Sequence, residues 1–119
     1  MIEYKNSWSV KLIKRINSNR DEIWNLISSP KNLELYHPFC KSNNVIKWPG
    51  KGSCDELTYL NGIKLIRNFT KWEEKRGYEL LIGRKNGKKS LVKWEIIEKN
   101  DKVYLCITVY PWFLRKKSK

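Results

Sequence analysis

Residues 92–109, VKWEIIEKNDKVYLCITV, decide the fold, because two apolar, alternating stretches flank a turn signal. Asn100-Asp101 in that position is typical of a β-hairpin with a two-residue loop. Such a loop sets the register and places Trp94 opposite Ile107 and Ile96 opposite Leu105. One face of this hairpin is therefore apolar, and we expect it to face inward. The inward set is Val92, Trp94, Ile96, Leu105, Ile107 and Val109.

Outward from this hairpin, alternation of apolar and polar residues predicts β-strands over most of the chain. The expected strands cover residues 7–17, 42–48, 54–60, 63–72, 78–82, 90–99 and 102–110. Asn61-Gly62 and Asn86-Gly87 are further turn signals between them. Strands joined by tight turns must be antiparallel, so the pattern predicts an antiparallel meander.

The turns also predict which side chains face inward in the earlier strands. A two-residue turn at Asn61-Gly62 places Glu56 opposite Arg67 on the expected concave side, with Phe69 on the same face. Tyr78 and Leu80 also face inward if Glu74–Gly77 forms a four-residue turn that aligns Phe69 with Ile82. A strict two-residue turn at Asn86-Gly87 would instead turn Leu81 inward and Leu80 outward, so we expect an odd loop length or a bulge there.

An ionic pair between Glu56 and Arg67 on a concave apolar surface has two interpretations. It is either a structural salt bridge near the end of the sheet or a sign that the inward face is wrongly chosen. The functional alternative is that Arg67 binds a carboxylate or phosphate of a ligand.

Helical signals are confined to the region between the first strand and residue 40. Asn19 followed by Glu22 resembles a capping box, and Ile23, Leu26 and Ile27 follow at helical spacing. A second short helix is expected over residues 31–36, ended by His37-Pro38.

Three groups of motifs accompany these elements: VKLI (10–13) leading into NSNRDEIW (17–24), SSPKNL (28–33) with YHP (36–38), and FTKWE (69–73). Together with the order of the elements, they resemble the helix-grip fold of the START-like superfamily, and within it the polyketide cyclase/dehydrase and lipid-transport type. The motifs are loose and span most of the chain. They imply the fold more than the ligand.

The expected architecture is α+β in one domain, residues 1–119. It has a curved antiparallel sheet of about six to seven strands and two short helices after the first strand. The resemblance implies a long C-terminal helix across the concave face, but few residues follow the last expected strand, so this helix is expected to be missing or very short. A homodimer partner, a lipid surface or a protein helix is then expected to cover the apolar concavity.

Composition narrows the partners and the compartment. The formal net charge of +13 favours anionic partners, although the cations are spread along the chain. Without a nucleic-acid motif, nucleic acid is not expected as a partner, while peripheral contact with anionic lipid fits the charge. Cys40, Cys54 and Cys106 form no zinc spacing, and no signal peptide or transmembrane run is visible, which favours a reducing cytoplasm.

The function expected from these features is binding, with transport as an extension of it, of a lipid, polyketide-like or isoprenoid compound in the concavity. The expected ligand-binding residues are Glu56, Arg67, Phe69, Tyr78, Leu80, Val92, Trp94, Ile96, Leu105 and Ile107, with Trp24, Tyr36 and His37 at the pocket mouth. With a single histidine, neither a metal site nor a cofactor is expected.

Two alternatives stay open. One is an enzyme of the cyclase or dehydratase kind, for which His37, Glu56 and Arg67 are the candidate polar groups. The other is an interaction domain that docks a protein or an anionic surface through its concave or basic face. Ligand binding is favoured over catalysis.

Overall fold

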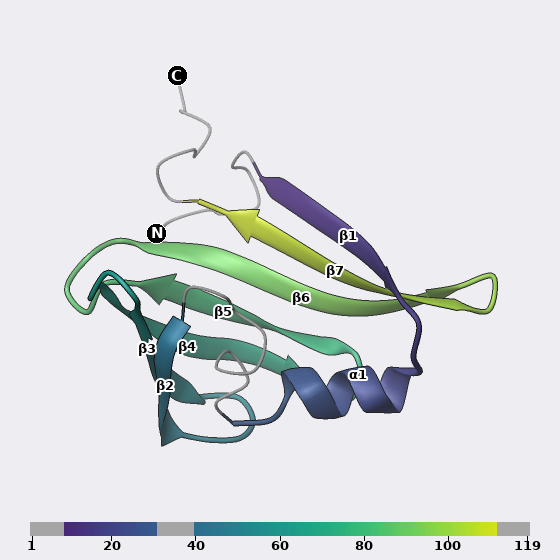
Figure 1. Cartoon of the computed structure of the whole chain (residues 1–119), viewed down its shortest axis with the longest axis horizontal. Helices are drawn as coiled ribbons and strands as arrows, with labels where there is room; N and C mark the ends of the chain where they lie inside the picture. Colours follow the sequence, from purple (N-terminus) through teal and green to yellow (C-terminus); the bar gives the residue numbers. More distant parts are fainter. Residues whose placement is uncertain (1–8, 31–39, 112–119) are drawn as a thin grey trace.

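The computed structural model describes residues 9–30 and 40–111. In this part of the chain, seven strands form one sheet with a single α-helix at one end (Figure 1). The elements are β1 (Val10–Ile16), α1 (Arg20–Ile27), β2 (Cys40–Lys47), β3 (Cys54–Tyr59), β4 (Lys64–Glu73), β5 (Gly77–Gly83), β6 (Lys89–Lys99) and β7 (Lys102–Tyr110). The α+β class with a curved antiparallel sheet is confirmed.

The strand order in the sheet is β1-β7-β6-β5-β4-β3-β2, with every neighbouring pair antiparallel. The β6–β7 register is confirmed, because Trp94 lies opposite Ile107 and Ile96 opposite Leu105. Asn100 and Asp101 both have positive φ, 54° and 63°, as a two-residue hairpin turn that follows the strand twist requires.

Helix α1 begins where the capping box predicts. The Asn19 side chain accepts a hydrogen bond from the backbone N–H of Glu22 at 2.8 Å, and the Asn19 amide donates to the Glu22 carboxylate at 2.8 Å. Arg20 then holds the start of the helix to the sheet by pairing with Glu98 at 2.6 Å. The helix expected over residues 31–36 and the expectation about the C-terminal helix lie outside the described residues.

The expected β3–β4 register is wrong by one residue. Asp55, not Glu56, lies opposite Arg67, and Glu56 lies opposite Ile66 on the convex face. Five residues, 59–63, separate the paired Thr58 and Lys64, whereas a two-residue turn was expected. A slip of one residue exchanges the two faces of a strand, so Leu57 points inward and is 1% exposed.

The two later connections preserve the expected inward face. Residues 84–88 lie between the paired Gly83 and Lys89, an odd loop length that confirms the expectation at Asn86-Gly87. The expected four-residue turn at Glu74–Gly77 is wrong, because Gly77 already pairs with Glu73 and leaves residues 74–76 in the turn. This shorter turn and a bulge between Phe69 and Lys71 each shift the β4–β5 register by one residue, so Phe69 lies opposite Leu80 and not Ile82. The expected pairing of Phe69 with Ile82 is therefore wrong, although both Tyr78 and Leu80 are buried with Phe69 in one core.

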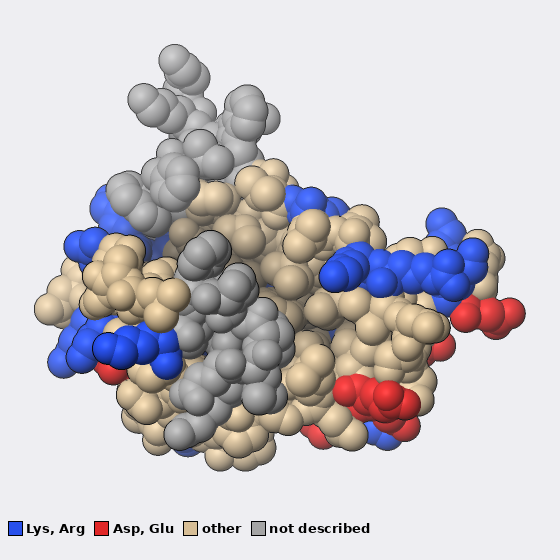
Figure 2. All heavy atoms as spheres, in the orientation of Figure 1, with Lys and Arg blue, Asp and Glu red and all other residues tan. Residues whose placement is uncertain are grey.

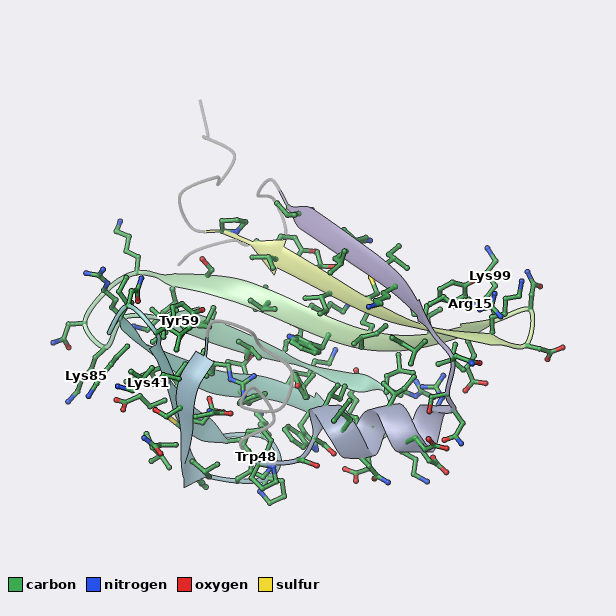
Figure 3. The ribbon with its side chains drawn as sticks, viewed as in Figure 1. Arg15, Lys41, Trp48, Tyr59, Lys85 and Lys99 are labelled. Carbon is green, nitrogen blue, oxygen red and sulfur yellow. The ribbon has the colours of Figure 1, made fainter. Side chains whose placement is uncertain are left out.

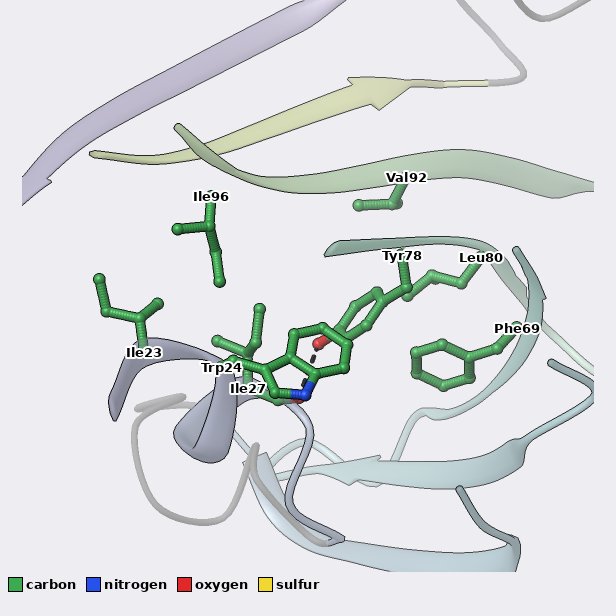
Figure 4. Close-up of a cluster of buried hydrophobic side chains, with 8 residues drawn as sticks. All are labelled: Ile23, Trp24, Ile27, Phe69, Tyr78, Leu80, Val92 and Ile96. Carbon is green, nitrogen blue, oxygen red and sulfur yellow. Dashed lines mark hydrogen bonds between the residues drawn. The ribbon is translucent and has the colours of Figure 1, made fainter. Parts of the chain in front are cut away.

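The core lies between α1 and the concave face of the sheet (Figure 4). Ile23, Trp24 and Ile27 of the helix are all buried against sheet residues, of which Phe69, Tyr78, Leu80, Val92 and Ile96 are buried as well. The Tyr78 hydroxyl donates a hydrogen bond to the Ile27 carbonyl at 2.9 Å, which joins the last turn of the helix to the middle of the sheet.

Candidate functional site

Aromatic side chains fill the concave face at the α1 end. The Tyr78 ring stacks on Trp72 at 5.3 Å between centroids and meets Phe69 edge-on at 4.9 Å. Trp48 closes the cluster against Phe69 at 5.1 Å, and its indole N–H donates to the Ser28 carbonyl at 2.8 Å. These rings are packed against one another and form a solid wall, so this end of the concavity offers structural support.

The concave face is more open toward β1 and β7. The inward residues of β1 pair with inward residues of β7, yet Val10 is 57% exposed and Leu12 is 61% exposed. Their partners Val109 and Ile107 are half-buried, as is Trp94 beside them on β6. This half of the concave face is therefore apolar and incompletely covered, and exposed apolar surface of this kind marks sites of interaction.

A buried polar network lies on the concave side of β2, β3 and β4. The Arg67 guanidinium donates through Nε to Asp55 Oδ1 at 2.8 Å and through Nη2 to Asp55 Oδ2 at 2.5 Å. Asn43 of β2 donates to Asp55 Oδ2 at 2.9 Å, and the guanidinium carbon lies 5.0 Å from the centre of the Phe69 ring. The side chains of Arg67 and Asp55 are 3% and 0% exposed.

This geometry favours a structural role for Arg67. Its charge is balanced by Asp55 in a two-point ion pair, the arrangement that offsets the cost of burying a guanidinium. A salt bridge was expected here with Glu56 as the partner. The correction replaces Glu56 by Asp55, because the one-residue register shift turns Glu56 to the convex face.

A cleft of about 400 Å³ opens on the concave side at the far end from α1. Leu65 and Ile82 provide apolar walls and Ser90 a hydroxyl, and these three residues follow the inward register of β4, β5 and β6. The loop over residues 84–88 forms the rim and contributes Arg84 and Lys88. An apolar cleft with a few polar groups at its rim has the character of a small-molecule site.

A larger cleft, of about 660 Å³, lies on the convex side near the β4–β5 turn. Its walls are mostly charged, and several of these charges are paired with each other. Lys71 lies 3.6 Å from Glu73, and Lys93 lies 3.6 Å from Glu95. Because these groups are hydrated and mutually compensated, this cleft does not suit an apolar ligand.

The Cys54 thiol lies on the convex face of β3 next to the polar network. Burial and the negative charge of neighbouring Asp55 both raise the pKa of Cys54 above its ordinary value of 9.0. A thiol with a raised pKa is protonated at neutral pH and is a poor nucleophile, so Cys54 is not poised for covalent catalysis.

Apart from Glu56 and Arg67, described above, the expected site residues separate into three groups. Trp24, Phe69, Tyr78, Leu80, Val92 and Ile96 are buried in the core, where they support the concave wall. Trp94, Leu105 and Ile107 are half-buried on the concave face. Tyr36 and His37 lie outside the described residues.

Leu65 and Ile82 were not among the site residues expected from the sequence. Ile82 follows Leu80 at the period of two that marks one strand face, so the signal was present. Leu65 precedes Arg67 by two residues and therefore shares its inward face, but its place in a cleft depends on the path of the loop over residues 84–88.

Neither a metal site nor a membrane-spanning helix is found in the described part of the chain. No group of His, Cys, Asp and Glu among residues 9–30 and 40–111 is arranged to hold a metal ion. The helix described here is also too short and too polar to cross a bilayer.

Comparison with solved structures shows which fold this is. Major latex-like protein 151 from Panax ginseng superposes with a TM-score of 0.69 at 12% identity, over 87% of this chain and 78% of that one. Protein MLL2253 from Mesorhizobium loti gives 0.71 at 13%, over 86% and 75%. The Aha1 dimer from Colwellia psychrerythraea gives 0.70 at 11%, over 88% and 77%.

No protein-family model matches the sequence, and no curated protein matches it either. At these low identities the likeness concerns the fold alone, and that fold is the helix-grip fold. The resemblance described from the sequence motifs is thereby confirmed at the level of the fold.

Proposed function

We propose that this chain binds a hydrophobic small molecule, such as a lipid, polyketide-like or isoprenoid compound, on the concave face of its sheet. The observation that carries the proposal is the incompletely covered apolar surface of the β1–β7 half, where Leu12 is 61% exposed. Apolar surface left in water is unfavourable by about 25 cal/mol per Å², so covering it with a ligand releases free energy.

The cleft between Leu65, Ile82 and Ser90 supports a specific position for part of this ligand. Its volume of about 400 Å³ falls within the range of small-molecule sites. An apolar chain against Leu65 and Ile82 would leave a polar end near Ser90 and the cationic rim. The ligand-facing residues proposed here are therefore Leu65, Ile82 and Ser90, followed along the concave face by Trp94 and Ile107.

Binding is favoured over the cyclase or dehydratase alternative by the positions of the polar groups. Glu56 lies on the convex face and the guanidinium of Arg67 is engaged by Asp55, so these two residues do not meet in the hollow as an acid and a base. General acid–base catalysis needs such groups within hydrogen-bond reach of the substrate.

A pair of tryptophan substitutions on opposite faces of the sheet tests the proposal. Ile82→Trp fills the cleft, whereas Ile66→Trp adds the same bulk on the convex face, and both isoleucines are half-buried. The assay is titration with cis-parinaric acid, a fluorescent fatty acid, after circular dichroism has verified the fold of each variant. We expect Ile82→Trp to weaken binding about tenfold or more, and Ile66→Trp to leave it unchanged.

Native mass spectrometry of the purified wild-type protein adds an independent readout. A mass increment that is lost on organic extraction is expected from a co-purified apolar ligand. A wild-type protein that carries no such increment and takes up no parinaric acid contradicts the proposed function. Equal weakening by both tryptophan variants contradicts the proposed position in the cleft.

Two further expectations concern the setting of the protein. A homodimer that covers the concave face remains a prediction, for which exposed Val10 and Leu12 on the outermost strand provide apolar surface. Free Cys54 and Cys106 are compatible with the reducing cytoplasm that we propose as its compartment.

A further inference from the structure

One end of the sheet carries exposed cations with no acidic residue near them in the sequence. We call this the hairpin end, because it carries the β3–β4 turn (residues 59–63) and the β5–β6 loop (residues 84–88). Antiparallel pairing brings both turns, together with the start of β2, to this end. Neither residues 57–66 nor residues 80–92 contain an Asp or Glu. The exposed cations there are Lys41, Lys64, Arg84, Lys85 and Lys88.

The opposite end of the sheet has mixed charge. There the β6–β7 hairpin carries Glu98 and Asp101 along with Lys99 and Lys102. Figure 3 shows Lys41 and Lys85 at the hairpin end, whereas Lys99 lies at the other end. On the face shown in Figure 2, the larger clusters of Asp and Glu atoms (red) lie toward the end of the sheet that carries α1. The sheet therefore separates an almost purely cationic end from an end where charges compensate one another.

An apolar side chain projects from the middle of this cationic end. Leu60 lies in the β3–β4 turn and is 65% exposed. The turn around it is well defined, because the Gly62 N–H donates to the Tyr59 carbonyl at 2.9 Å and the Asn61 side chain accepts from the Ile63 N–H at 3.1 Å. Leu60 is thus held away from the core by a hydrogen-bonded turn.

We propose that the hairpin end docks on an anionic lipid bilayer, with Leu60 entering the interfacial region and Lys64 and Lys85 contacting lipid headgroups. Cations near an anionic bilayer add to binding individually, and an apolar side chain among them gains by leaving water. An exposed leucine gives no comparable advantage on the phosphate backbone of a nucleic acid, which is bound through charge. The combination of charge and apolar tip therefore favours the bilayer.

The same end carries the mouth of the concave cleft. Arg84 and Lys88 belong both to the cationic surface and to the rim of the cleft formed with Leu65 and Ile82. Docking would consequently turn the cleft toward the bilayer, which is where apolar molecules are most concentrated. This inference goes beyond ligand binding, and either property can be absent while the other is present.

Two double variants with equal loss of charge test the docking surface. Lys64→Gln/Lys85→Gln removes two exposed cations from the hairpin end, outside the cleft lining. Lys99→Gln/Lys102→Gln removes two exposed cations from the β6–β7 hairpin at the other end. The assay is co-sedimentation with vesicles of phosphatidylcholine and phosphatidylglycerol, with pure phosphatidylcholine vesicles as the uncharged reference.

We expect the first double variant to bind the anionic vesicles roughly 20- to 30-fold more weakly, since each cation contributes about fivefold. The control double variant should stay within about twofold of wild type. Leu60→Ser should weaken vesicle binding about tenfold without affecting binding to duplex DNA. Parinaric acid binding by Lys64→Gln/Lys85→Gln should equal that of wild type, which separates docking from ligand uptake.

Three results would overturn the proposal. Equal loss in the two double variants would mean that total charge, rather than the hairpin end, determines binding. Unchanged vesicle binding by Leu60→Ser, together with tighter binding of wild type to duplex DNA than to vesicles at the same salt, would identify a nucleic-acid surface. Failure of wild type to bind anionic vesicles would remove the docking property while leaving the ligand result intact.

Discussion

Replacement of Arg67 by methionine isolates the contribution of the buried ion pair to the stability of the concave sheet. The guanidinium makes two charge-assisted hydrogen bonds to Asp55, at 2.8 and 2.5 Å, and the carboxylate is 0% exposed. Arg67→Met leaves this carboxylate buried, with a hydrogen bond from the Asn43 amide but without its cation. Removal of one member of a buried pair costs about 3–5 kcal/mol, so we expect a loss of that size in the free energy of unfolding.

The double variant Asp55→Leu/Arg67→Met distinguishes the charge from the packing. With both charges removed, no buried charge is left unpaired, and the Asn43 amide loses its bond to Asp55, which costs about 1–3 kcal/mol. The double variant should therefore be more stable than Arg67→Met alone, although it departs further from wild type. Lys71→Met on the same strand removes an exposed ion-paired cation and should cost less than about 1 kcal/mol.

The measurement is urea unfolding at neutral pH followed by tryptophan fluorescence, with the free energy of unfolding taken from each transition. If Arg67→Met is too unstable to purify, Arg67→Lys retains the charge without the two-point geometry and gives a measurable intermediate loss. A cost of Arg67→Met as small as that of Lys71→Met would refute the reasoning. A double variant less stable than Arg67→Met would refute it as well.

Two further predictions concern the helix contact and the thiol. Tyr78→Phe removes the hydrogen bond to the Ile27 carbonyl at 2.9 Å and should lower the free energy of unfolding by about 1–2 kcal/mol, measured by the same urea transitions. A loss below about 0.3 kcal/mol would show that the bond is dispensable. The raised pKa of Cys54 means that the folded state keeps this thiol protonated at a pH where the unfolded state ionises. The contribution of this protonated thiol to stability is present below pH 9.0 and is lost as the pH rises above that value. Wild type should therefore lose more stability than Cys54→Ala between pH 8 and about 10.5. Parallel pH profiles of the two proteins would contradict a raised pKa of Cys54 in the folded state.

The comparison of hairpins shows where local sequence is sufficient to predict register. In β6–β7 one face is consistently apolar and the turn has the residues that a two-residue loop needs, so both signals agree. In β3 the neighbours Asp55 and Glu56 are both acidic, and either can pair with Arg67 after a slip of one residue. The deciding fact is the burial of Leu57, which depends on strands that lie across the sheet.

The sequence by itself determined the antiparallel meander, the capped helix after the first strand and the apolar face shared by β6 and β7. These features follow from period-two alternation, the Asn19–Glu22 capping pair and the turn at Asn100-Asp101, all of which act between residues close in the chain. Only the tertiary structure decided that Asp55 pairs with Arg67, that Leu65 and Ile82 share a cleft, and that the cations of two separate turns gather at one end. Each of these features depends on loop lengths and strand pairing, which place residues that are distant in sequence side by side. A local sequence pattern does not determine which distant residues become neighbours.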